Sequence, residues 1–196
     1  MEKGGLAHAL DAIGLTRDSR IGFADELRLG LRGTTRRVWG RRGVKVRQRL
    51  QLKYEWRYLF AAVDGQSGQI WWNWVPSMKA EALWPLVAGL QEMDVLEGLV
   101  WDNAPSHCDG DITDLDLALV GLPPYSPELN PAERLFGEIR RRVEGRVYAT
   151  LDDKADDVQA FLEQLDADPP RVRRLCGWDW INAAIATLPA PLTNAA

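Results

Sequence analysis

The sequence has few of the residues that stabilise small secreted domains or form zinc sites. It contains two cysteines, Cys108 and Cys176, and two histidines among 196 residues. These are too few for a disulfide framework or a cysteine-based zinc site, so we expect an intracellular, reducing compartment. No apolar run approaches the roughly 20 residues that a membrane-spanning helix requires. The N-terminus also lacks a basic region followed by an apolar stretch, so neither a membrane span nor a secretory signal is expected.

The composition is that of an ordinary folded domain, but the charges are unevenly distributed. Hydrophobic residues make up 46% and charged residues 27% of the chain, and the net charge is −4. Ten basic residues nevertheless lie between Arg32 and Arg57, where Glu55 is the only acid, and a second basic group lies between Arg134 and Arg146. This asymmetry is typical of a protein that contacts phosphates with one face. Two solvated faces of opposite charge explain it equally well.

The first clue to function is a carboxylate at an unexpected position in a predicted strand. From Ile21 to Arg32 apolar and polar residues alternate, which predicts a half-buried strand. Asp25 falls in the apolar phase, between Phe23 and Leu27. A carboxylate at such a position is costly unless another group compensates its charge.

The remaining pattern predicts an α/β fold. Strands are expected at 54–63 and 70–75, joined as a hairpin, and short buried strands at 96–101 and 117–122. Helices are expected at 79–93, from Asn130 onward, at 151–165 and within 172–185. We expect a mixed five-stranded sheet flanked by helices, for which the ribonuclease H-like (retroviral-integrase-like) architecture is one solution. Residues 1–20 are expected to form a lead-in with a partial helix, residues 21–187 the domain, and residues 188–196 a frayed tail.

Three acids stand where such a fold would place a site. Asp25 interrupts a strand, Asp102 ends a buried strand, and Glu133 begins a helix after a proline-rich loop. The carboxyl ends of strands gather at one edge of an α/β sheet. Carboxylates brought together raise each other's pKa unless a cation is present. Mg²⁺ prefers oxygen ligands, and two such ions can drive phosphoryl transfer.

Each acid also has a purely structural interpretation. Asp25 could be the buried partner of a nearby arginine, and Asp102 followed by Asn103 could form a simple turn. Glu133 could be the acid of a capping box that reaches back to Asn130. For Glu133 taken alone, capping is the better explanation, and only the constellation of three acids favours catalysis.

Two sequence strings carry a family resemblance. They read Trp101-Asp102-Asn103-Ala104-Pro105-Ser106-His107 and Leu122-Pro123-Pro124-Tyr125-Ser126-Pro127-Glu128-Leu129-Asn130-Pro131-Ala132-Glu133, and they follow Phe23-Ala24-Asp25-Glu26 and Arg37-Val38-Trp39-Gly40-Arg41-Arg42-Gly43. In these segments the chain resembles the DDE superfamily endonuclease domain of bacterial insertion-sequence transposases related to the mariner type. The resemblance extends from about residue 21 to about residue 181.

The resemblance implies a function and a set of site residues. It implies that Asp25, Asp102 and Glu133 are the catalytic acids and bind two Mg²⁺ or Mn²⁺ ions, which cut transposon ends and join 3′-hydroxyls to target DNA. The auxiliary residues expected near the site are Glu26, Asn103, His107 and Asn130. The basic residues expected to contact DNA are Arg36, Arg37, Arg41, Arg42, Lys45, Arg140 and Arg141.

The resemblance also implies partners. We expect a homodimer or larger assembly on DNA, in the cytoplasm and associated with the nucleoid. Family members carry helix-turn-helix domains before the first Asp, whereas about twenty residues precede Ile21 here, so a helix-turn-helix protein from an upstream reading frame is a candidate partner. Two other hypotheses remain open. One is a catalytically idle remnant that binds DNA or a transposase, and the other is a nuclease acting on RNA–DNA hybrids.

Overall fold

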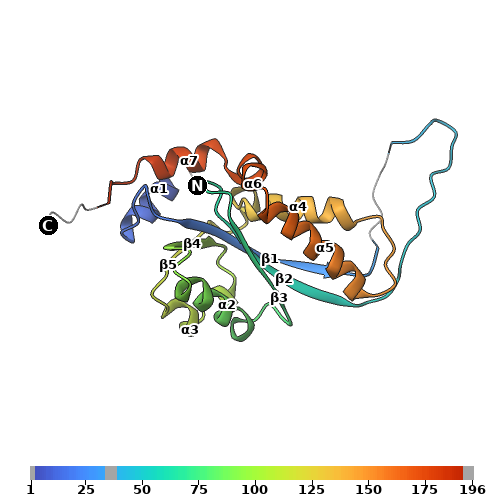
Figure 1. Ribbon diagram of the computed structural model, residues 1–196, viewed down its shortest axis with the longest axis horizontal. Helices are drawn as coiled ribbons and strands as arrows, with labels where there is room; N and C mark the ends of the chain where they lie inside the picture. Colours follow the sequence, from blue (N-terminus) through green and yellow to red (C-terminus); the bar gives the residue numbers. More distant parts are fainter. Residues whose placement is uncertain (1–2, 34–38, 192–196) are drawn as a thin grey trace.

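The computed structural model describes residues 3–33 and 39–191, which form a mixed five-stranded sheet between helices (Figure 1). The strands are β1 (Ile21–Gly30), β2 (Trp56–Val63), β3 (Ile70–Val75), β4 (Gly98–Trp101) and β5 (Ala118–Gly121). Their order across the sheet is β3-β2-β1-β4-β5. The first three strands pair antiparallel, and β1, β4 and β5 run parallel. The predicted mixed five-stranded sheet is confirmed.

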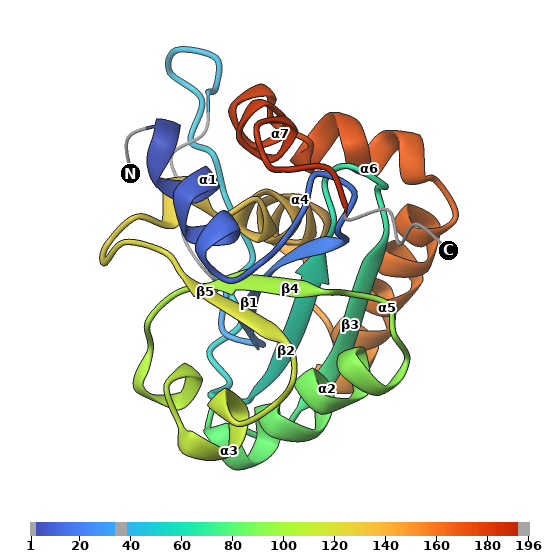
Figure 2. The same ribbon diagram turned by 90° about the vertical axis from the view of Figure 1, so that its left-hand side faces the viewer.

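The helices cover both faces of the sheet (Figure 2). One face carries α1 (Lys3–Ala12), α4 (Ala132–Val143), α5 (Leu151–Asp166), α6 (Pro169–Cys176) and α7 (Asp179–Ala186), and the other carries α2 (Ala80–Glu92) and α3 (Gly110–Thr113). Two short 3₁₀ helices, η1 (Pro105–His107) and η2 (Pro127–Leu129), lie in the loops after β4 and β5. None of the described helices is long and apolar enough to cross a membrane.

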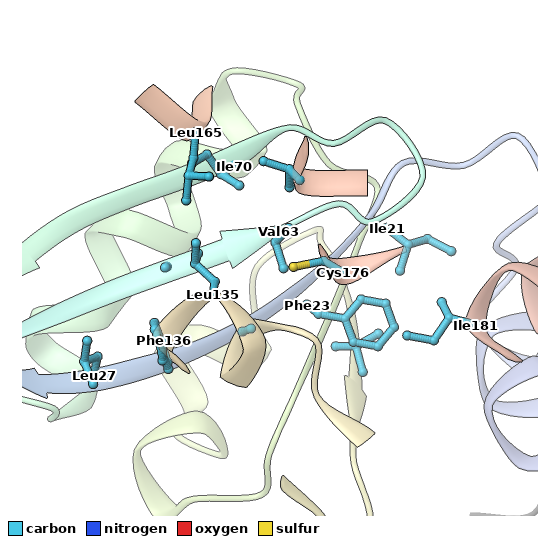
Figure 3. Close-up of a cluster of buried hydrophobic side chains, with 14 of the residues drawn as sticks. Ile21, Phe23, Leu27, Val63, Ile70, Leu135, Phe136, Leu165, Cys176 and Ile181 are labelled. Atoms are coloured by element: carbon cyan, nitrogen blue, oxygen red, sulfur yellow. The ribbon is translucent and has the colours of Figure 1, made fainter. Parts of the chain in front are cut away.

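The larger core lies between the sheet and α4–α7. Phe23 and Val63 from the sheet, Phe136 from α4 and Cys176 from α6 meet there (Figure 3). Burial raises the pKa of the Cys176 thiol to about 12, so this cysteine behaves as an apolar core residue. Leu188, assigned from the sequence to the tail, is also buried in this core.

The expectation that β1 is half-buried along its whole length is wrong. Gly22 and Ala24, in the polar phase of the pattern, are as buried as Ile21 and Phe23. The reason is that β1 is central, so helices cover both faces of its first half. Alternation of burial begins only at Leu27, where the second face is no longer covered.

The pairing of β1 places its carboxylate at an open edge. In the described residues, β4 pairs with β1 only from Ile21 to Phe23, whereas β2 follows β1 as far as Gly30. Asp25 therefore lies two residues beyond the last residue paired with β4. Asp102 directly follows Trp101, the last residue of β4, so both acids meet at the same end of these parallel strands.

The basic segment between β1 and β2 forms an arm without regular structure. Residues 39–55 project away from the sheet (Figure 1), and nearly all of them are exposed. Hydrogen bonds from Gly33 N to Gln51 O and from Leu31 N to Glu55 O fix the base of the arm. The strand expected to begin at Tyr54 instead begins at Trp56.

Candidate active site

The three acids predicted from the sequence line one pocket. Asp25 comes from β1, Asp102 from the end of β4 and Glu133 from the first turn of α4. The pocket has a volume of about 500 Å³, and its other lining residues are Asn103, Ala104, Leu122, Pro123, Pro124, Tyr125, Ser126, Pro127 and Asn130. Residues as far apart as 25 and 133 are thus brought together by the parallel strands and the return of the chain into α4.

Asp25 is the acid whose ionisation is most perturbed. Its pKa is raised to about 7, first because the side chain is withdrawn from water. A hydrogen bond from Glu26 N to Asp25 Oδ1 at 2.8 Å opposes this shift. The negative charges of Glu26, Glu133 and Asp102 raise the pKa further. No described arginine forms a salt bridge with Asp25, so the buried-arginine interpretation is not supported.

Asp102 is held by a histidine that a second acid supports. His107 Nδ1 lies 2.7 Å from Asp102 Oδ1 and 3.1 Å from Asp102 O, and its Nε2 lies 3.1 Å from Glu26 Oε1. Both ring nitrogens therefore face carboxylate or carbonyl oxygens, an arrangement that favours the protonated imidazolium form. Burial lowers the pKa of His107, but Glu26 and Asp102 outweigh it and leave the pKa raised.

These contacts hold the Asp102 carboxylate through its Oδ1 atom, while most of the side chain stays exposed to solvent. The side chains of His107 and Glu26 are 1% and 3% exposed, whereas that of Asp102 is 58% exposed. The imidazole also stacks on Trp101 at 4.0 Å between ring centroids. Asp102 Oδ1 additionally accepts a hydrogen bond from Ala104 N, so the expected turn is present alongside the contact with the site.

Glu133 is positioned by Asn130. Asn130 is buried, and it donates from Nδ2 to Ala24 O at 2.9 Å and accepts at Oδ1 from Ala132 N at 3.0 Å. Its Oδ1 thus satisfies the first backbone N–H of α4, although this helix begins at Ala132 with Pro131, not Asn130, at its N-cap. Its Nδ2 ties the start of the helix to β1 beside Asp25. The capping-box interpretation of Glu133 fails, because Asn130 N donates to Pro127 O and the Glu133 carboxylate pairs with Arg140 at 3.2 Å.

Asn103 locks the loop after β4 to the end of β5. Its Nδ2 donates to Leu122 O. A Cβ on Gly121 would lie 2.0 Å from Asn103 Oδ1, so only glycine leaves room for this amide. All four residues expected to be auxiliary thus lie in or beside the pocket.

Sequence reasoning missed Tyr125 on the rim of the pocket. Its side chain is fully exposed, and its backbone has φ 56, a left-handed conformation that bulky residues rarely adopt. Strained backbone conformations cluster at functional sites. The signal in the sequence was the set of prolines at 123, 124 and 127, which restrict this loop.

Carboxylates are the ligand type that Mg²⁺ and Mn²⁺ prefer, although these three acids do not surround a metal site on their own. All three candidate ligands are carboxylates, and the pKa of Asp25 is raised first by burial and then by the nearby charges of Glu26, Glu133 and Asp102. Among the described residues, no group of three His, Cys, Asp or Glu side chains converges closely enough to enclose a metal. Mg²⁺ does not require such a cage, because it commonly uses one or two carboxylates together with water and substrate phosphates.

The residues expected to bind DNA fall into two groups. Arg41, Arg42 and Lys45 are exposed on the arm, whereas Arg36 and Arg37 lie outside the described residues. On α4, Arg140 pairs with Glu133 and Arg141 pairs with Glu138. Arg140 is therefore part of the acidic site itself.

Comparisons with known proteins agree with this geometry. A family model described as the DDE superfamily endonuclease matches residues 20–155. A search of the curated proteins gives no match. Three solved structures of the Mos1 transposase resemble the chain at 15–16% identity.

The structural matches cover nearly all of this chain. The Mos1 mariner paired-end complex with Mn (15% identity) has a TM-score of 0.67 and covers 92% of this chain and 57% of that chain. The Mos1 strand transfer complex (16%) has a TM-score of 0.67 and covers 94% and 59%. The catalytic domain of Mos1 mariner transposase (15%) has a TM-score of 0.55 and covers 92% and 85%. The fold is thus ribonuclease H-like, and the chain spans less than two thirds of the transposase chains in the two complexes.

Proposed function

Because the chain belongs to the DDE superfamily endonuclease family, we propose that residues 21–187 form the catalytic domain of a DNA transposase of the insertion-sequence type related to mariner. The proposed reaction is metal-dependent cleavage of transposon-end DNA and joining of the freed 3′-hydroxyl to target DNA. The observation that carries the proposal is the convergence of Asp25, Asp102 and Glu133 on one pocket, together with the raised pKa of Asp25.

The three acids are proposed to hold two Mg²⁺ or Mn²⁺ ions. When bound, these ions supply activation of the attacking oxygen and stabilisation of the leaving oxygen. The Mos1 paired-end complexes described with Mn and with Mg support the choice of metal. In this chain His107 would hold Asp102 in orientation, and Asn130 would hold the helix that presents Glu133. Such support from buried residues is what keeps catalytic groups in productive geometry.

DNA is the proposed partner, and the arm is the proposed contact with its backbone. The side chains of Arg41, Arg42 and Lys45 are exposed, and no carboxylate among the described residues forms a salt bridge with them, which suits sequence-independent contact with phosphates. The paired-end and strand transfer complexes of Mos1 support DNA as the partner, and we propose a homodimer or larger assembly on it. We also propose a location at the bacterial nucleoid and an association with a separate helix-turn-helix protein.

The test is cleavage of DNA by purified protein with Mn²⁺ or Mg²⁺. Wild-type protein should nick supercoiled plasmid and cut duplexes that carry the ends of the element, and EDTA should stop both reactions. Asp102→Ala should lower the rate at least a hundredfold, because the substitution removes a proposed metal ligand. Asp111→Ala, which removes an exposed acid outside the pocket, is the matched control. Equal cleavage by wild-type protein and Asp102→Ala would contradict the assignment.

One observation favours a second candidate, a catalytically idle module that binds DNA or a transposase. Arg140 Nη1 lies 3.2 Å from Glu133 Oε2, so this arginine competes with a metal for the Glu133 carboxylate. In that case Mn²⁺ would not raise the melting temperature, although DNA would still bind. Metal-dependent stabilisation that is lost in Asp102→Ala would exclude this candidate.

A further inference from the structure

A second pocket lies on the β1–β2 ribbon, on the face opposite to Asp25. It has a volume of about 580 Å³ and is lined by the side chains or backbone of Arg28, Gly30, Arg32, Tyr54, Glu55 and Trp56. Even-numbered residues of this ribbon face the α2 side of the sheet, as Ala24 and Phe60 do. Beyond Tyr58 no described helix covers that face, so Trp56 and Tyr54 are 45% and 67% exposed.

The pocket combines aromatic rings with guanidinium groups. The guanidinium of Arg28 lies 4.0 Å from the centroid of the Trp56 ring, and that of Arg32 lies 4.9 Å from the Tyr54 ring. Within residues 3–33 and 39–191, no carboxylate forms a salt bridge with Arg28 or Arg32. Each arginine therefore offers a flat, charged surface, backed by an aromatic ring, to a planar ligand.

Gly30 keeps the centre of the pocket open. It pairs directly with Trp56 across the ribbon, so a side chain at position 30 would stand beside the indole. A Cβ at Gly30 would meet Glu55 O at 3.5 Å and Trp56 Cβ at 4.0 Å, which are ordinary contacts. The backbone thus tolerates a larger residue at position 30. The absence of a side chain there leaves the space beside the Trp56 indole open.

We propose that this pocket binds one unpaired nucleobase of DNA, stacked on the Arg28–Trp56 and Arg32–Tyr54 pairs. The exposed aromatic faces favour a base, because stacking requires a free π-face that paired bases do not offer. The arginines then reach the phosphates on either side of the base.

The position of the pocket connects it with the candidate active site. Arg28 lies three residues after Asp25 in β1, a rise of about 10 Å. In the described residues β4 does not pair with this part of β1, so no neighbouring strand separates Arg28 from the edge beside the acids. The inference rests on the proposed function in that it takes DNA as the ligand. The bound base would lie within a few nucleotides of the phosphate at the acids.

The test measures binding without cleavage, by fluorescence anisotropy in EDTA. Three labelled ligands are compared: a blunt duplex, the same duplex with a four-nucleotide overhang, and that duplex with abasic sites in the overhang. Wild-type protein should bind the intact overhang about tenfold more tightly than the abasic overhang, since stacking of one base contributes about this much. Trp56→Ala and Gly30→Val should remove the difference and leave binding of the blunt duplex unchanged.

Controls separate stacking from other effects of substitution. Trp56→Phe keeps an aromatic face and should keep most of the preference. Trp84→Ala removes another exposed tryptophan, on α2, and should leave the preference for the intact overhang unchanged. Gly30→Val removes no interacting group, so it tests the pocket even if Trp56→Ala unfolds the protein.

The outcomes are decisive in both directions. The proposal is overturned if wild-type protein binds both overhangs equally, or if Trp56→Ala weakens all three ligands alike, as a phosphate-binding surface would. Base preference in a protein that shows no metal-dependent cleavage would support the pocket and reject the proposed function. Cleavage without base preference would support the proposed function and reject the pocket.

Discussion

The raised pKa of Asp25 predicts that the metal-free protein loses stability as the pH rises. A carboxyl with a pKa of 3.8 when unfolded and about 7 when folded holds its proton more tightly in the folded state. Its contribution to stability is therefore complete below pH 4 and is lost as the pH rises through about 7. His107, whose pKa is also raised, acts in the same direction, so the two effects must be separated by mutation.

The magnitude follows from the size of the shift. A shift of about three pH units corresponds to at most about 4 kcal/mol, lost at about 1.4 kcal/mol per pH unit between the two pKa values. Because the Asp25 side chain is only half-buried, solvent screens part of this effect and we expect about 2 kcal/mol for Asp25. Asp25→Asn keeps the oxygen that accepts from Glu26 N and removes the charge. It should therefore be more stable than wild type at pH 8 by about 2 kcal/mol and equal to it near pH 4.

Urea unfolding of both proteins in EDTA, from pH 4 to pH 8, measures this difference. Added Mg²⁺ should reverse the trend in the wild type, because the metal binds the ionised carboxylates and competes with protons. At a hundredfold excess over the dissociation constant it should restore about 2.7 kcal/mol at pH 8. This stabilisation by Mg²⁺ should be nearly absent at pH 5 and in Asp25→Asn. Parallel pH curves for the two proteins in EDTA would refute the reasoning.

Two further predictions concern the loop that leads into α4. Asn130→Ala removes two buried hydrogen bonds and should lower the free energy of unfolding by about 2–3 kcal/mol, whereas Asn130→Ser, which retains a capping oxygen, should cost about half as much. Urea denaturation checks this, and a cost below about 0.5 kcal/mol for the alanine variant would contradict the role of Asn130. Tyr125→Gly should be more stable than Tyr125→Ala by about 1 kcal/mol, because only glycine relieves the positive φ. Equal melting temperatures for these two variants would show that the loop carries no strain there.

The parts of the fold that local patterns specify were predictable from the sequence. The bounds of β3 match the prediction because a run of five apolar residues, interrupted only by Asn73, follows a glycine-containing turn. The start of α5 at Leu151 agrees as well, and it is fixed by a capping box between Thr150 and Asp153. Asp25 could be singled out because a carboxylate interrupts an apolar phase.

What could not be predicted depends on contacts between distant segments. Glu26 lies in the polar phase of β1, which indicates solvent, yet its side chain is buried against His107, 81 residues away. Only the packing of η1 against the second face of the sheet brings them together. The pairing of Arg140 with Glu133 was missed for a different reason, since a seven-residue spacing on one helix does not by itself indicate a contact.

The support for the three acids differs in a way that bears on their roles. Asp25 is half-buried and accepts a hydrogen bond from Glu26 N, and Asp102 is held by His107, so the positions of both are set before any ligand arrives. Glu133 is fixed through its helix, while its carboxylate is bound to Arg140, a partner that a metal would have to displace. Since an exposed ion pair of this kind contributes only about 0–1 kcal/mol, the displacement is within reach of a divalent cation. Two acids are therefore preorganised, and the third is the one whose contacts must change when metal and DNA bind.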